Sequence, residues 1–266
     1  MNIVHKIKMP VRFFQPILVS LVYLFLYLPI LVMVLFSFNN SSITRKWEGF
    51  SLQWYKQLLD TPDMINALQV SLIVACCTTI LSLIIGTCFV VAHKWWKSDF
   101  LFNLFYANIL LPDIVLAIGI LSIFTFVRIP LGYGSLIVGH TLIGLGFVIP
   151  IVKARFTELD PFLTEASLDL GATYYQTFTR VIIPLLMPSL IASGLLVFTL
   201  SLDDFLIAFF CSGPQVQTLS VYVYSMVKTG VNPIINAMSA VLLALSGLLV
   251  FILSSLNVID QVISHD

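Results

Sequence analysis

Charged residues are what this sequence has least of. Only 10% of its 266 residues are Asp, Glu, Lys or Arg, whereas about a quarter is usual in soluble proteins. The formal net charge is +0, so the chain offers neither a basic surface for nucleic acid nor an acidic field that steers ligands. Hydrophobic residues make up 59% of the chain, and the mean hydropathy is +1.03. This composition predicts an integral membrane protein.

The chain also lacks the motifs of metal, disulfide and nucleotide sites. Its four cysteines sit in apolar runs without Cys-x-x-Cys or Cys/His spacing, which argues against a metal site or a disulfide framework. No Gly-x-x-x-x-Gly-Lys-Ser/Thr stretch occurs, so any ATP that drives the protein binds to another chain. We therefore expect no cofactor in this chain. Of the four histidines only His140 lies in an apolar run, where we expect a packed, hydrogen-bonded side chain.

Long apolar runs, by contrast, are abundant. Six stretches are long enough to cross a membrane as helices, and they predict an all-α integral membrane protein with a single domain over residues 1–266. The stretches are 16–38, 67–92, 101–127, 135–152, 185–211 and 234–258. The first is longer than a signal-peptide core and no small-x-small cleavage site follows it, so we expect it to remain as a helix. Pairs of small residues four apart, Ser135 with Gly139 and Ser189 with Ser193, favour close helix packing in lipid.

The basic residues predict how the chain is oriented in the membrane. Six crossings place both ends on one side, and cytoplasmic ends put eight Lys and Arg inside against five outside. The long segment 153–184, called the polar loop below, is then cytoplasmic. On the other side, Ser51 precedes an amphipathic run with Trp54 and Tyr55, which predicts a short helix at the membrane interface.

The polar loop predicts two short helices that meet at a glycine. One run covers 165–170 and stops at Gly171, a residue suited to a left-handed helix end. The second covers 173–182 and is expected to end at Pro184. A compact polar segment of this kind, between two membrane-length helices, can dock into another protein.

The same segment resembles the EAA loop of ABC-importer permeases, in which Glu-Ala-Ala, Gly and Ile-x-Leu-Pro follow at set spacing. The matching residues here are Glu165, Ala166, Ser167, Gly171, Val181, Ile183 and Pro184. Ser167, Val181 and Ile183 depart conservatively from the pattern. The resemblance implies that the loop couples the chain to a dimer of ATPase subunits, which would hold ATP and Mg. The alternative is an ordinary cytoplasmic loop that holds these residues by chance.

Three aspartates fall inside predicted membrane helices. A carboxylate there costs on the order of 3 kcal/mol, so such residues usually face a cavity, a partner or a pathway. Asp113 is expected near the middle of a helix kinked by Pro112. Asp203 and Asp204 are expected in the outer third, and because adjacent helical residues point about 100° apart, we expect only one of them to face a narrow path. The alternative is that the aspartates pair with polar groups of the chain and shape its helices.

Most of the chain is similar to the spermidine/putrescine importer permeases. The similarity lies in 198–205 with its Asp-Asp pair, in Ser212-Gly213-Pro214, in 224–233, and in Leu111-Pro112-Asp113. It implies a type I ABC-importer permease fold (MetI-like), and a bacterial inner-membrane chain that carries polyamines together with a second permease and a periplasmic binding protein. The outer loops 39–66 and 212–233 would contact that protein. The implied substrate pathway includes Asp113, Asp203, Asp204, Tyr222 and Tyr224, because carboxylates with nearby aromatic rings suit ammonium groups.

Three alternatives remain open. The first keeps the importer and changes the cargo to another small cationic or organic substrate, thiamine or iron. The second is an intramembrane aspartyl protease, in which two aspartates share a proton. The Gly-x-Gly-Asp context of such enzymes is missing, and that class does not explain the polar loop. The third is an ion channel built on Asp113.

Overall fold

The computed structural model describes residues 8–41, 46–96, 99–229 and 233–255, and every regular element in these ranges is a helix. The all-α prediction is confirmed. The described residues fall into two compact units, one within Met1–Thr61 and Met226–Leu245 and the other within Pro62–Ser225 and Ser246–Asp266. One permease domain over residues 1–266 stays a prediction.

The first unit contains the N-terminal helix and the loop that follows it. Its elements are α1 (Lys8–Ser37), α2 (Gln53–Leu59) and the first part of α12 (Pro233–Ser255). Asn39 is almost fully buried, forms an antiparallel bridge with Phe50, and accepts a hydrogen bond on its carbonyl from Trp54 Nε1 at 2.6 Å. Ser51 Oγ accepts from the backbone N–H of Gln53 at 3.2 Å. The short helix predicted after Ser51 is therefore present.

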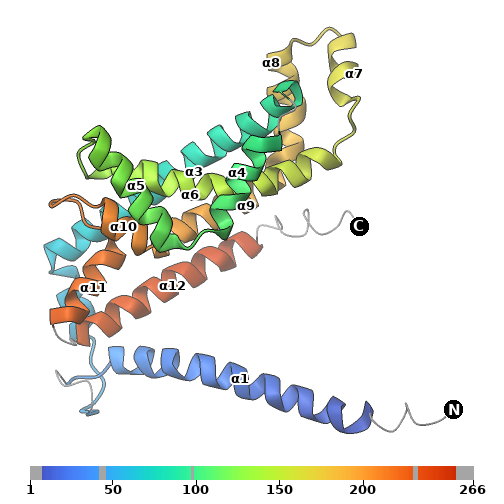
Figure 1. The fold of residues 1–266 in the computed structure, drawn as a ribbon. Coiled ribbons are helices and arrows are strands. Elements are labelled where there is room, and N and C mark those ends of the chain that lie inside the picture. The colour runs from blue at the N-terminus through green and yellow to red at the C-terminus, as the bar shows by residue number, and fades with distance from the viewer. Residues whose placement is uncertain (1–7, 42–45, 97–98, 230–232, 256–266) are drawn as a thin grey trace. The chain divides into compact units, whose positions relative to one another are not determined.

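The second unit holds the long apolar helices and the polar loop. Its elements are α3 (Pro62–Trp96), α4 (Asp99–Leu110), α5 (Asp113–Val127), α6 (Tyr133–Glu158), α7 (Leu163–Asp169), α8 (Tyr174–Thr177), the π-helical turn η1 (Phe178–Ile182), α9 (Ile183–Asp203), α10 (Leu206–Cys211) and the first part of α11 (Leu219–Thr229). In Figure 1, α6 runs from the end of this unit that holds α5 and α10 to the end that holds α7 and α8.

The third predicted helix, 101–127, is broken in two. α4 ends at Leu110, α5 begins at Asp113, and the two helices are bent by 117°. Pro112 has extended angles, φ −59° and ψ 133°, and its nitrogen carries no hydrogen to continue the helical bonds. The predicted kink is a full break because a proline also drives the residue before it away from helical angles.

The fifth predicted helix, 185–211, is wrong at both ends. The helix begins at Tyr174 and runs without interruption to Asp203. Pro184 does not end the preceding run as predicted, because it lies in the first turn of α9 and the preceding turn takes the wider π spacing. At the other end, Asp204 has extended angles (φ −63°, ψ 125°) and α10 starts separately.

Four of the described helices are long and apolar enough to cross a membrane, or five spans result if the bent pair α4 and α5 counts as one. They lie in α1, in α3, in α6 and in Tyr174–Asp203. The described apolar part of α12 is the shorter segment Pro233–Ala244, and the predicted end at residue 258 lies outside the described residues. The six-span count stays a prediction.

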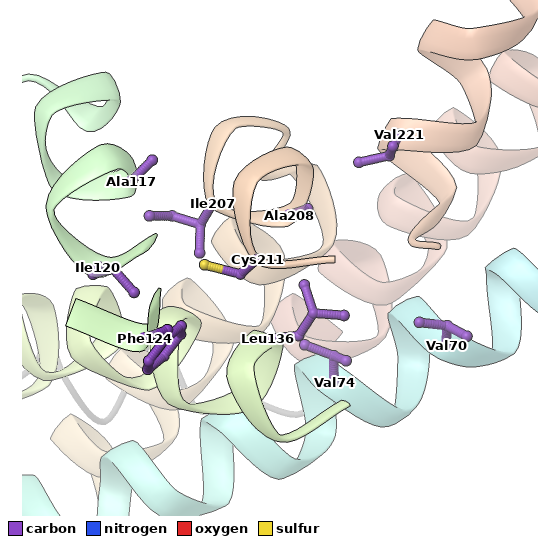
Figure 2. Packing of buried hydrophobic residues seen from close by; sticks show 10 residues of the cluster. All are labelled: Val70, Val74, Ala117, Ile120, Phe124, Leu136, Ile207, Ala208, Cys211 and Val221. Atoms are coloured by element: carbon purple, nitrogen blue, oxygen red, sulfur yellow. The ribbon is translucent and has the colours of Figure 1, made fainter. Parts of the chain in front are cut away.

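Helix α6 is the centre of the second unit and contributes to two buried clusters. Figure 2 shows the first, in which side chains from α3, α5, α6, α10 and α11 come together, including Leu136 of α6 and Cys211 of α10. The second joins α3, α4, η1 and α9 around Val148 and Ile149 of α6. The described part of this unit is therefore packed around one long helix.

Small residues allow this close approach. A Cβ atom at Gly139 would lie 2.8 Å from Ile207 Cγ2, and one at Gly144 would overlap Ser82 Oγ and lie 2.9 Å from Val197 Cγ1. The four residues of the predicted small pairs are all buried, in α6 and α9. Glycine and serine therefore set the distance between α6 and its neighbours, as the spacing predicts.

We expect Gly144→Ala to destabilise the protein by about 1 to 3 kcal/mol, because the added methyl group must push α3 and α9 away from α6. The matched control is Gly119→Ala in α5, where no heavy atom lies within 4 Å of the added carbon. Thermal unfolding of the purified protein in detergent should show a lower midpoint for Gly144→Ala only. Equal midpoints for the two variants would contradict the packing described here.

Candidate functional site

The three membrane aspartates line one cavity in the second unit. Asp113, Asp203 and Asp204 share with His140 a cavity of about 390 Å³. We call it the aspartate cavity. Its walls come from the beginning of α5, the end of α9, the start of α10 and the middle of α6. Residues 90 positions apart in the sequence thus meet at one place.

The two helix breaks bring the aspartates together. Asp113 is the first residue of α5, and Asp203 is the last of α9. The expected position of Asp113 near the middle of one kinked helix does not hold, because α4 ends before Pro112 and Asp113 begins a separate helix. Both Asp203 and Asp204 line this cavity, and the expectation that only one of them faces a substrate path stays a prediction whose helical premise does not hold. The 100° rotation applies only between helical residues, and Asp204 has extended backbone angles.

Asp204 is held by its surroundings. Its Oδ2 accepts a hydrogen bond from the backbone N–H of Ala208 at 3.0 Å, which satisfies an otherwise free amide at the start of α10. Its carbonyl accepts from Ser220 Oγ at 2.7 Å, which ties α11 to the break. Its side chain is 17% exposed and lies 3.7 Å, Oδ2 to Nε2, from His140. Asp204 therefore has a structural role in addition to lining the cavity.

Asp113 and Asp203 differ from Asp204. Both are exposed, and among the described residues neither side chain has a hydrogen-bond or ion-pair partner. The residues that line the cavity include no Lys or Arg. A cation about 4 Å from one carboxylate gains roughly 4 kcal/mol at an effective dielectric of 20, before its own desolvation is subtracted. The arrangement suits a positively charged ligand.

Tyr222 and Tyr224 lie on α11 and are not among the residues that line the cavity. The ring of Tyr224 lies 4.6 Å, between centroids, from that of Phe205, which does line it. Tyr222 accepts a hydrogen bond on its carbonyl from Ser225 Oγ at 2.7 Å. Of the two predicted pathway tyrosines, Tyr224 is thus connected to the cavity wall through one aromatic neighbour. The assignment of both to a pathway stays a prediction.

His140 and Ser201 also line the cavity, and the sequence did not single them out as site residues. His140 Nδ1 lies 2.8 Å from Ser201 Oγ, so the expected packed and hydrogen-bonded histidine is present. The signal in the sequence was weak: one histidine in an apolar run, and a serine two residues before the Asp-Asp pair. In the described part of the chain, no group of three or more His, Cys, Asp or Glu side chains could hold a metal ion.

The polar loop forms a turn whose shape comes from local hydrogen bonds. Gly171 has φ +87°, and the N–H groups of Gly171 and Ala172 donate to the carbonyls of Leu168 and Ser167, which is the Schellman pattern of a helix end. Thr173 then starts α8 with a reciprocal side-chain cap to Gln176. These contacts give the loop a defined corner between its two helices.

Ser167, a departure from the EAA pattern, contributes to the corner. Its Oγ lies 2.9 Å from the Oγ1 of Thr177, which is 2% exposed. The bond joins α7 to α8, and an alanine at this position could not make it. Glu165 and Ala166 lie exposed on α7, and Glu165 also lines a cavity of about 460 Å³ between the loop and α3.

Large apolar side chains are exposed on this corner. Leu170 is 90% exposed and Tyr175 75%, and Phe162 and Tyr174 are exposed as well. Val181 and Ile183 are half-buried, and Pro184 is exposed in the first turn of α9. Exposed aromatic and aliphatic side chains next to charged ones are typical of a surface that binds another protein.

Comparison with known proteins gives concordant results. A family model described as "Binding-protein-dependent transport system inner membrane component" matches residues 78–264. The chain is 36% identical over 248 residues to the spermidine/putrescine transport system permease protein PotC of Escherichia coli, an alignment that covers 92% of this chain and 91% of that protein. It is 34% identical over 262 residues to the putrescine transport system permease protein PotI of Escherichia coli, with 95% and 92% covered.

A solved structure shows the same fold. The crystal structure of a bacterial ABC transporter involved in the import of the acidic polysaccharide alginate superimposes with a TM-score of 0.73 at 15% identity, and covers 94% of this chain and 96% of the other. At this identity the likeness concerns the fold alone. The helical arrangement is that of an ABC-importer permease.

The three aspartates differ in their hydrogen bonds, so their substitutions should differ in their effects on stability. Asp204→Ala should destabilise the protein by about 1 kcal/mol, because the amide of Ala208 loses its acceptor, while Asp204→Asn keeps an acceptor oxygen. Asp113→Asn and Asp203→Asn should leave stability unchanged or raise it, because each removes repulsion between carboxylates. Thermal unfolding of the four variants in detergent measures this. Losses for Asp113→Asn and Asp203→Asn as large as for Asp204→Ala would mean that these residues are structurally paired.

Proposed function

We propose, since the chain belongs to the family of binding-protein-dependent transport system inner membrane components, that it is the permease subunit of an ATP-driven importer of polyamines. As a permease it is a multi-pass membrane protein and not itself an enzyme. The observation that carries the cargo assignment is a pair of carboxylates in one cavity, Asp113 and Asp203, which have no hydrogen-bond or ion-pair partner in the described part of the chain.

The chemistry of the cavity supports a polyamine. Spermidine and putrescine carry two or more ammonium groups joined by apolar carbon chains. The aspartate cavity offers three carboxylates together with apolar walls, including Phe147 and Phe205. Aromatic faces and carboxylates both attract ammonium groups. The names of the relatives point to the same cargo, since PotC is a spermidine/putrescine and PotI a putrescine permease.

The polar loop supports the proposed partners. Its exposed corner would dock into a dimer of ATPase subunits that bind ATP and Mg, with Glu165 facing a basic group of the partner. A second permease chain would complete the passage, and a periplasmic binding protein would deliver the cargo to the outer loops 39–66 and 212–233. Closure of the ATPases would move the loop and open the helices outward, which is alternating access.

The orientation of the chain is part of the proposal. Docking to ATPases requires the polar loop to be cytoplasmic, as the distribution of Lys and Arg predicts. Both termini would then be cytoplasmic in the bacterial inner membrane. Residues 1–7 and 256–266, on which that placement depends, lie outside the described residues.

Other cargoes and other classes of protein agree less well with the aspartate cavity, the polar loop and the relatives. A different small cation remains the strongest alternative, since any ammonium would be attracted by the same carboxylates. The shared cavity is compatible with the aspartyl-protease alternative, because it brings the aspartates together. The relatives named above, however, are transport permeases. A channel built on Asp113 explains neither the polar loop nor the relatives.

The main test is uptake of labelled spermidine and putrescine into cells without their own polyamine importers. The cells receive this chain with the ATPase, the second permease and the binding protein encoded beside it. We expect ATP-dependent uptake that is lost with Glu165→Ala, which removes the carboxylate proposed to face the ATPase. Uptake should also be lost with Gly171→Pro, since proline cannot adopt the φ of +87° that Gly171 has.

The matched control for Glu165→Ala is Asp169→Ala, which removes a carboxylate from the same helix but outside the EAA pattern. All three variants should reach the membrane. Normal uptake by Glu165→Ala or Gly171→Pro would contradict the coupling assignment. Absence of polyamine uptake by a wild-type complex that assembles and hydrolyses ATP would overturn the cargo and keep the importer.

The carboxylates should matter for transport more than for assembly. Asp113→Asn and Asp203→Asn should each lower the rate of polyamine uptake about tenfold, the expected loss of one charge-assisted bond to an ammonium group. Asp204→Asn, which keeps an acceptor oxygen for the amide of Ala208, should do the same. Co-purification of the ATPase should be unchanged in all three variants. An unchanged uptake rate would assign the residue concerned to structure alone.

A further inference from the structure

One nitrogen of His140 has no hydrogen-bond partner among the described residues. Its side chain is 2% exposed, and Nδ1 lies 2.8 Å from Ser201 Oγ. Nε2 is buried, has no hydrogen-bond partner among the described residues, and belongs to a ring that lines the aspartate cavity. An unpaired buried polar atom destabilises the fold unless a partner satisfies it. Such an atom in the wall of a cavity points to a ligand.

The nearest acidic atom does not satisfy this nitrogen. Asp204 Oδ2 lies 3.7 Å from Nε2, which is beyond hydrogen-bond distance, and it already accepts from the amide of Ala208. A group that donates to both atoms would satisfy Nε2 and pair with the carboxylate of Asp204.

The bond to Ser201 leaves Nε2 able to accept. A neutral imidazole has one donor and one acceptor nitrogen, and a serine hydroxyl can either donate or accept. When Nδ1–H donates to Ser201 Oγ, Nε2 carries the lone pair and can accept a hydrogen bond. The buried His140–Ser201 contact is kept in this tautomer.

The arrangement favours an alkyl ammonium over a metal ion. His140 and the three aspartates line one cavity, yet they do not converge on a point at which a metal could be held, as the described residues contain no such group. A primary ammonium group has three N–H donors and can bridge acceptors that are several ångströms apart. A longer cation with more than one ammonium can reach several carboxylates at once.

We propose that His140 is a direct cargo ligand, whose Nε2 accepts a hydrogen bond from a primary ammonium group held by the carboxylates of the aspartate cavity. This rests on the proposed function, and it adds a neutral acceptor to a site otherwise made of carboxylates. A neutral acceptor orients the ammonium group without adding negative charge to the membrane interior.

The experiment compares His140→Asn with His140→Gln in the complete importer, with labelled spermidine as the probe. Asparagine places its amide near the position of Nδ1, so it keeps the contact with Ser201 and loses the acceptor in the cavity. Glutamine places its amide near the position of Nε2, so it keeps an acceptor in the cavity and loses the contact with Ser201. We expect uptake to fall about tenfold in His140→Asn and to stay within about twofold of wild type in His140→Gln.

The reverse order would show that His140 acts through Ser201, and it would overturn the proposal. Equal rates for the two variants, whether normal or lost, would also overturn it, because the position of the nitrogen would then not matter. Thermal unfolding of both complexes shows whether a lost rate comes from misfolding. A failure of the proposed function looks different, since the wild-type importer itself then takes up no polyamine.

Discussion

A backbone that leaves helical geometry inside an apolar protein must find new hydrogen-bond partners, and the second unit depends on how it meets this constraint. At the end of α9, Asp204 Oδ2 accepts a hydrogen bond from the amide of Ala208, and the carbonyl of Asp204 accepts one from Ser220 Oγ. At the start of α5, Pro112 has no amide hydrogen to satisfy, and its carbonyl accepts from Val115. The two breaks are stable for different chemical reasons. Together they place the aspartates in one cavity.

The packing around α6 makes these breaks possible. Gly139 and Gly144 let α10, α3 and α9 approach α6 so closely that an added methyl group has no space. Ser135 Oγ donates to the carbonyl of Cys211 at 2.8 Å and so fixes the end of α10 against the start of α6. The position of α10, and with it that of Asp204, is therefore set by small residues on a neighbouring helix.

The polar loop follows a different principle, since its shape is local. The left-handed Gly171, the cap at Thr173 and the bond between Ser167 and Thr177 all lie within a few residues of one another. Such a corner forms without long-range contacts. The aspartate cavity, by contrast, is assembled from distant parts of the chain and changes whenever α5, α6 and α9 shift.

The sequence alone determined what depends on composition and on neighbouring residues. Scarce charge and long apolar runs indicate an all-α membrane protein, and the polar loop indicates two short helices that meet at Gly171, because capping and turn signals act over a few residues. It also identified Asp113, Asp203 and Asp204 as costly residues. It misjudged their geometry, since it assumed unbroken helices. Only the tertiary structure decided that the helices break fully at Pro112 and Asp204, and that His140 joins the aspartates from α6 with Nε2 unpaired among the described residues. The meeting of His140 with the aspartates depends on contacts between helices far apart in the chain, and helical periodicity carries no information about such contacts. The break at Pro112 is local, but a proline in the sequence does not by itself distinguish a kink from a full break.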